Sequence, residues 1–166
     1  MNSELNYIQG FLDAFAWINH KTNHGYSFQI TLIEKNAPIE EVIETYITNL
    51  YTTKEEIVKY NYLHVKTSWK KELEKNLIKW LFQFQSDQFG GNHFLKDQSY
   101  QFSLSKKSFV QIMLKEFIKN FESIGVDFQP YNVQIDFENG LYEVEYNDLL
   151  LLSKRKSILL HLGQSD

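Results

Sequence analysis

The hydrophobic pattern of this 166-residue chain changes its period near Gly125, and that change limits the folds open to it. Before Gly125 apolar residues recur every three or four positions, which predicts amphipathic helices. These predicted helices cover 4–20, 38–50, 68–84 and 106–124. After Gly125 apolar and polar residues alternate, which predicts strands, and 26–34 alternates in the same way. Residues 60–66 fit either a strand or a helix. We therefore expect an α+β fold in which N-terminal helices pack on one face of an antiparallel C-terminal sheet, a β-meander.

Length and composition place the chain among compact proteins. With 166 residues, 43% of them apolar, it predicts one domain spanning 1–166. Because the sequence has no cysteine, disulfide scaffolds, thiolate zinc sites and thiol nucleophiles are excluded. No apolar run is long enough to span a bilayer, and the N-terminus lacks the features of a signal peptide. We expect a soluble, cytoplasmic protein without a membrane partner.

Asn139-Gly140 is a strong signal for a two-residue hairpin turn. With that turn Asp136 lies opposite Glu143, and Ile135 lies opposite Val144. One face of the ribbon is then apolar, and its members are Val133, Ile135, Phe137, Tyr142, Val144 and Tyr146. The other face carries Asp136, Glu138, Glu143 and Glu145. A slip of one residue would expose the whole apolar set, so pattern and turn support the same register.

The carboxylates of this ribbon form the candidate partner-binding site. The segment 126–148 contains six acidic residues and no lysine or arginine, whereas the rest of the chain has an excess of two positive charges. Like charges opposite one another destabilise a strand pair, so a cationic partner docking there would explain the arrangement. The proposed contacts are Asp136, Glu138, Glu143, Glu145 and Asp148. The alternative is a solvated strand face that is relieved by lysines from elsewhere in the fold.

Other candidate chemistry is less specific. His20 and His24 have a spacing that metal sites use, but position 21 is Lys, so a zinc-protease motif is absent, and histidines at a helix C-terminus also complement its dipole. Asp136 and Glu143 could form the carboxylate pair of a hydrolase, but an exposed sheet face is a poor place to raise a pKa by desolvation. We predict no catalytic residues, no metal and no other cofactor.

Four lysines, at 70, 71, 75 and 79, lie between Trp69 and Trp80, and basic residues combined with aromatic ones can indicate a nucleic-acid binder. Their spacing places Trp69 and Trp80 on the buried stripe and the lysines opposite, and a net charge of −4 also disfavours a phosphate-backbone binder. We therefore expect no direct contact with nucleic acid. An uncharacterised enzyme or small-ligand protein remains an alternative, with a pocket lined by Trp17, Trp69 or Trp80.

The C-terminal stretch, Tyr146-Asn147-Asp148-Leu149-Leu150 followed by Ser157–Asp166, resembles the ending of bacterial immunity proteins of contact-dependent growth inhibition and related polymorphic toxin systems. The resemblance implies a cytoplasmic protein that binds and neutralises a cognate toxin domain, often a nuclease, and it transfers no site residues. Such a binder is not an enzyme, and a cationic nuclease surface would suit an acidic inhibitor. A scaffold subunit that self-associates through an exposed strand edge is a third possibility, and the sequence leaves the oligomeric state open.

Overall fold

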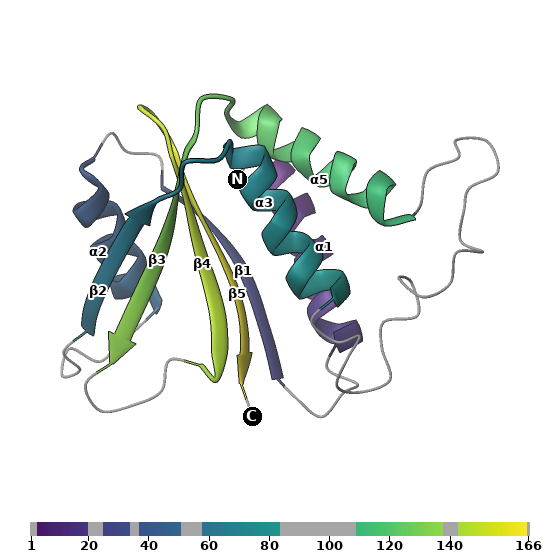
Figure 1. The fold of residues 1–166 in the computed structure, drawn as a ribbon, viewed down its shortest axis with the longest axis horizontal. Helices are drawn as coiled ribbons and strands as arrows, with labels where there is room; N and C mark the ends of the chain where they lie inside the picture. The colour runs from purple at the N-terminus through teal and green to yellow at the C-terminus, as the bar shows by residue number, and fades with distance from the viewer. Residues whose placement is uncertain are drawn as a thin grey trace.

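The computed structural model describes residues 3–19, 25–33, 37–50, 58–83, 109–137 and 143–165. Within these ranges the chain forms four α-helices, one π-helical segment and five strands (Figure 1). In chain order these are α1 (Ser3–Asn19), β1 (Gly25–Ile33), α2 (Ile39–Leu50), β2 (Val58–His64), α3 (Trp69–Leu77), η2 (Ile78–Gln83), α5 (Phe109–Ile124), β3 (Gln129–Phe137), β4 (Glu145–Leu152) and β5 (Ser157–Ser165). The predicted α+β class is confirmed.

The five strands form one antiparallel sheet in the order β1-β5-β4-β3-β2. Strands β3, β4 and β5 are sequential neighbours, as expected of a meander, and the Ser153 N–H bonds the Lys156 carbonyl at 3.0 Å to close the β4–β5 turn. The two N-terminal strands extend this meander at opposite edges, because β1 pairs with β5 and β2 pairs with β3. The ambiguous segment at 60–66 therefore belongs mainly to a strand.

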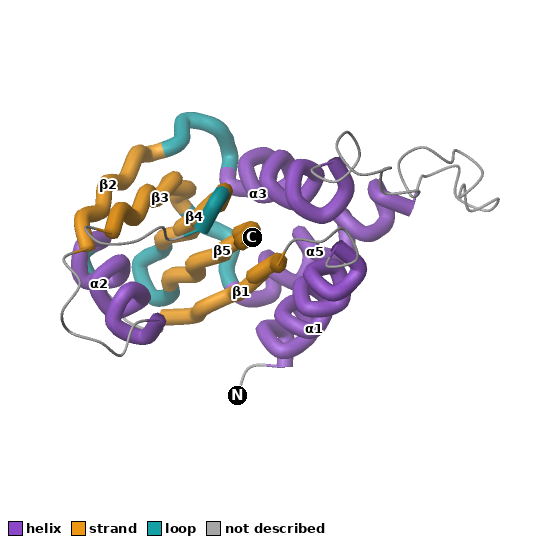
Figure 2. The backbone as a smooth tube through the Cα atoms, turned by 90° about the horizontal axis from the view of Figure 1, so that it is seen from below, coloured by secondary structure: helices purple, strands orange, loops and turns teal. Residues whose placement is uncertain are grey.

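Helices cover both faces of this sheet, as the view in Figure 2 shows. Helices α1, α3 and α5 pack against one face, where the core includes Leu149, Leu151 and Leu160. Helix α2 packs against the opposite face, with Leu150 and Leu159 in its core. The expectation that the helices share one face thus holds for three of the four described. Because successive side chains of a strand point to opposite faces, the leucine run in β4 requires cover on both sides.

The third helix changes from α to π geometry at Ile78. Its wider turns accompany three consecutive buried residues, Trp80, Leu81 and Phe82, each exposed by 1% or less. Asn19 of α1 donates a hydrogen bond to the Trp80 carbonyl at 3.2 Å, so a polar group of the first helix satisfies this irregular backbone. The segment also carries Lys79 toward β4, where the predicted site begins.

Candidate functional site

The strands of the predicted hairpin have a different register from the one that the Asn139-Gly140 turn would give. Val133 pairs with Asp148, whereas a two-residue turn would place Tyr146 there. The predicted register is therefore wrong by two residues, and the turn itself lies outside the described residues. Because the offset is even, Tyr146 still shares a face with Val133, as the alternation predicted.

A side chain replaces the strand pairing beyond Val133. The Tyr146 hydroxyl donates a hydrogen bond to the Ile135 carbonyl at 2.9 Å and accepts one from the Ile135 N–H at 3.1 Å. Burial raises the pKa of Tyr146, which keeps its hydroxyl protonated and able to donate. This bridge spaces β3 from the start of β4, so the carboxylates of the two strands do not lie directly opposite one another as predicted.

Two of the predicted contact residues point into the protein. The side chain of Asp148 is fully buried, and its Oδ1 lies 2.7 Å from His161 Nδ1. The side chain of Glu143 is 10% exposed, and its Oε1 lies 3.4 Å from His161 Nε2. Gly163 makes room for this carboxylate, because a Cβ at that position would overlap it. We call Glu143, Asp148 and His161 the buried cluster.

The buried cluster is an internal ion pair. Burial alone would lower the pKa of His161, but the hydrogen bonds and charges of Asp148 and Glu143 outweigh it and raise the pKa to about 9. The imidazolium then donates toward both carboxylates, so neither ring nitrogen is available as a metal ligand. The described residues contain no group of three or more acidic or histidine side chains arranged to hold a metal ion. His20 and His24 lie outside them.

Two other carboxylates of the ribbon, Glu145 and Asp136, have a lysine of this chain as an ion-pair partner or a cross-strand neighbour. Glu145 Oε1 bonds Lys79 Nζ at 2.7 Å, and both side chains are about two-fifths exposed. Asp136 is exposed, but its cross-strand neighbour on β2 is Lys59. Glu138 lies outside the described residues. The predicted exposed face is therefore wrong at Glu143, which lies against His161, and the fold supplies Glu145 with a cation that the local sequence lacks.

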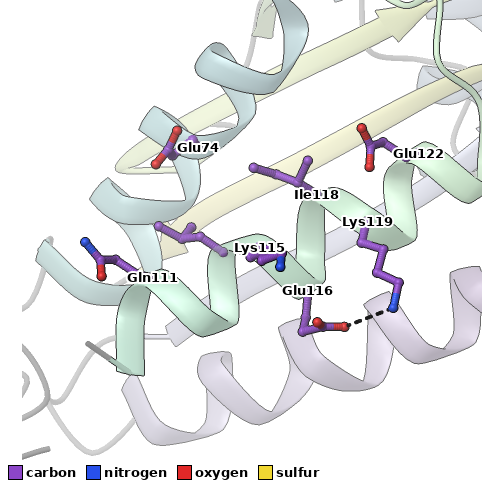
Figure 3. Close-up of a pocket in the computed structure, with 8 residues that line it drawn as sticks. Glu74, Gln111, Lys115, Glu116, Ile118, Lys119 and Glu122 are labelled. Carbon is purple, nitrogen blue, oxygen red and sulfur yellow. Dashed lines mark ion pairs between the residues drawn. The ribbon is translucent and has the colours of Figure 1, made fainter. Parts of the chain in front are cut away.

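None of the three tryptophans lines either of the two hollows described below. Trp80 is buried and Trp69 nearly so, whereas Trp17 is 67% exposed on α1. A groove of about 550 Å³ lies between α3 and α5, and Figure 3 shows its charged side chains. They are Glu74, Lys115, Glu116, Lys119 and Glu122. Because both signs are interleaved there, the groove does not select one sign of charge. A second hollow, of about 770 Å³, lies beside the β4–β5 turn, and again no tryptophan lines it.

A different surface gathers carboxylates with aromatic rings. The Tyr62 hydroxyl donates a hydrogen bond to Glu40 Oε1, and the Tyr60 hydroxyl donates one to Glu44 Oε1 at 3.1 Å. Tyr131 on β3 stacks edge-on against Tyr62, with ring centroids 6.1 Å apart. We call Glu40, Glu44, Tyr60, Tyr62 and Tyr131 the α2–β2 face. The sequence predicted the helix at 38–50 that carries the glutamates, but it left 60–66 undecided and so missed the tyrosines.

The hydrogen bond between Tyr62 and Glu40 shifts the pKa of both groups. The bond from Tyr62 lowers the pKa of Glu40, and that same bond is the main reason why the pKa of Tyr62 is raised. The pKa of Tyr60 is raised by burial first and by the bond to Glu44 second. Glu40 is therefore held ionised, and Tyr60 and Tyr62 are held neutral, near neutral pH.

A scan against protein-family models gave no match, and neither a curated protein nor a solved structure matches the chain. None of the described helices combines the length and the apolar character needed to cross a bilayer.

Proposed function

We propose that this protein is an immunity-type inhibitor, which binds a cognate basic toxin domain and holds it inactive. The toxin domain would be a nuclease, because a surface that binds phosphate is cationic and complements carboxylates. The resemblance of the C-terminal stretch to immunity proteins motivates the class. The α2–β2 face carries the proposal, since it combines the exposed ring of Tyr62 with the exposed carboxylates of Glu40 and Glu44.

Two properties of the α2–β2 face favour a protein partner. Tyrosine is enriched in protein interfaces because it offers a large, rigid apolar area and a polar tip. Here Tyr62 is 39% exposed while its hydroxyl is fixed by Glu40, so docking would immobilise little additional freedom. Helix α2 contains three glutamates and no lysine or arginine, so its exposed side keeps one sign of charge.

Charge reversal on the α2–β2 face tests the proposal. The double variant Glu40→Lys/Glu44→Lys should weaken binding to the toxin domain encoded beside this gene by at least tenfold, mainly through slower association at low salt. Calorimetry gives the affinity, and inhibition of the purified toxin domain gives the function. The matched control, Glu74→Lys/Glu116→Lys, makes the same change of charge in the α3–α5 groove and should bind as the unmodified chain does.

Equal loss of affinity in both variants would show that net charge matters and the α2–β2 face does not. Absence of binding and inhibition by the unmodified chain would refute the proposed function itself. Charge reversal at Glu143 is unsuited to this test, because it would place a lysine against His161 inside the protein.

A further inference from the structure

The two edge strands of the sheet differ in how their outward backbone groups are covered. At the β1 edge, the amide of Gln9 on α1 acts like a neighbouring strand. Its Nε2 donates a hydrogen bond to the Phe28 carbonyl at 2.9 Å, and its Oε1 accepts one from the Ile30 N–H at 2.9 Å. Edge strands are templates for pairing with other chains, so this side chain protects β1.

The β2 edge has no comparable cover among the described residues. The Val65 N–H bonds the Pro130 carbonyl at 2.9 Å, which places Val65 in a hydrogen-bonded pair with β3. Because such pairs alternate in antiparallel strands, the backbone groups of Tyr60, Tyr62 and His64 point away from β3. Figure 1 shows β2 as the outermost strand, on the side away from α1, α3 and α5.

The side chains of β2 do little to discourage pairing. The register with β3 runs without a bulge from Val58 to His64, and the strand contains no proline. Leu63 is 71% exposed, and Lys59 is the only charged residue of the strand apart from His64. Bulges, prolines and charges are the usual means of blocking an edge.

We propose that β2 is a docking edge, to which an extended segment of a basic partner protein adds as a sixth strand. The proposal rests on the proposed function and gives its mode of binding: main-chain hydrogen bonds to Tyr60, Tyr62 and His64 provide affinity, and Glu40 and Glu44 beside the edge select lysine and arginine side chains.

Charge argues against a second copy of this chain as the occupant. Antiparallel pairing of two β2 strands would place two α2 helices on the same face of the joined sheet. Each helix carries three glutamates and no lysine or arginine, so the two would repel one another. A basic segment brings no second set of glutamates to the edge, and its positive charges attract those of α2.

Peptides and amide exchange test the docking edge directly. The probe is an alternating Lys-Val peptide of the same length as β2, compared with an alternating Glu-Val peptide and with Lys-Val peptides N-methylated on alternate residues in either phase. The Lys-Val peptide should slow hydrogen exchange of the Tyr60, Tyr62 and His64 amides in ¹⁵N spectra. At least one N-methylated phase and the Glu-Val peptide should not. Protection elsewhere, or equal binding of all four peptides, would overturn the proposal.

A pair of variants isolates the main-chain contribution. His64→Pro removes an outward N–H and the ring, whereas His64→Ala removes the ring alone. The proline variant should bind the Lys-Val peptide about five- to tenfold more weakly than the alanine variant, which corresponds to one main-chain hydrogen bond. If the proline variant does not fold, the N-methylated peptides still decide the matter.

Two further results separate the possibilities. A dimer of the unmodified chain with a protected Tyr62 amide would replace the basic partner by a second copy and overturn the proposal. Peptide docking at β2 without inhibition of the toxin domain would refute the proposed function and leave the docking edge intact. If instead His64→Pro and His64→Ala inhibit the toxin domain equally well, the docking edge would be refuted and the proposed function would remain.

Discussion

Replacement of His161 by glutamine tests the energetic role of the buried cluster. The pKa of His161 is about 9 in the folded protein, against 6.5 for an unperturbed histidine. This difference corresponds to about 3 kcal/mol of stability in the protonated state. His161→Gln removes the cation and leaves Asp148 and Glu143 facing a neutral amide. At pH 6 we expect the free energy of unfolding to fall by about 3 kcal/mol, with a melting temperature about 10 °C lower.

The pH dependence distinguishes this mechanism from a simple loss of packing. Because the folded state binds the proton more tightly than the unfolded state, the contribution of His161 is fully present below pH 6.5. It decreases as the pH rises and is lost as the pH passes about 9. The difference between the unmodified chain and His161→Gln should therefore shrink steadily across that interval.

Urea unfolding at several pH values between 6 and about 9.5 measures this difference, with the buried Trp80 as the fluorescence reporter. The matched control is His64→Gln, which removes an exposed histidine whose ring packs on Tyr131. Its effect on the free energy of unfolding should be small. If His161 itself titrates near 6.5 by NMR in the unmodified chain, or if the two variants behave alike, the reasoning is refuted.

Two further changes test neighbouring features. Gly163→Ala should displace the Glu143 carboxylate, lower the melting temperature and move the pKa of His161 downward, which NMR titration measures; an unchanged pKa would show that Glu143 contributes nothing. Gln9→Ala should uncover the Phe28 carbonyl and the Ile30 N–H, cost about 1–2 kcal/mol in urea unfolding and increase self-association in light scattering, whereas a monomer of unchanged stability would contradict the protective role of Gln9.

The alternation of apolar and polar residues predicted the face of the sheet for Tyr146 correctly, but not its cross-strand partner. It placed Tyr146 with Val133 and Ile135, which the structure confirms despite the error in register. The same parity puts Asp148 on the apolar side of its strand, and His161 lies among leucines. A buried acid and a buried base each require a partner, and these two lie on adjacent predicted strands. The pairing of Asp148 with His161 could therefore have been predicted from the sequence.

The compensating cations were harder to predict because they come from distant segments. Lys59 faces Asp136 only because β2 adds beside β3, and no local pattern reveals which strand becomes that neighbour. Lys79 reaches Glu145 from the π-helical segment, whose geometry departs from the period used to predict it. Charge patterns describe a surface only after the order of the strands is known.

The internal partners of these carboxylates bear on where the proposed partner would bind. Carboxylates already held by His161 or Lys79 would have to exchange an internal partner for an external one, so docking on them gains little. Glu40 and Glu44 are different, because their carboxylates accept hydrogen bonds from neutral tyrosine hydroxyls, which leave the negative charge in place. A cation arriving at the α2–β2 face therefore adds an interaction without breaking an ion pair. Since the adjacent β2 edge also offers backbone groups that β3 does not use, charge and main chain select the same side of the molecule.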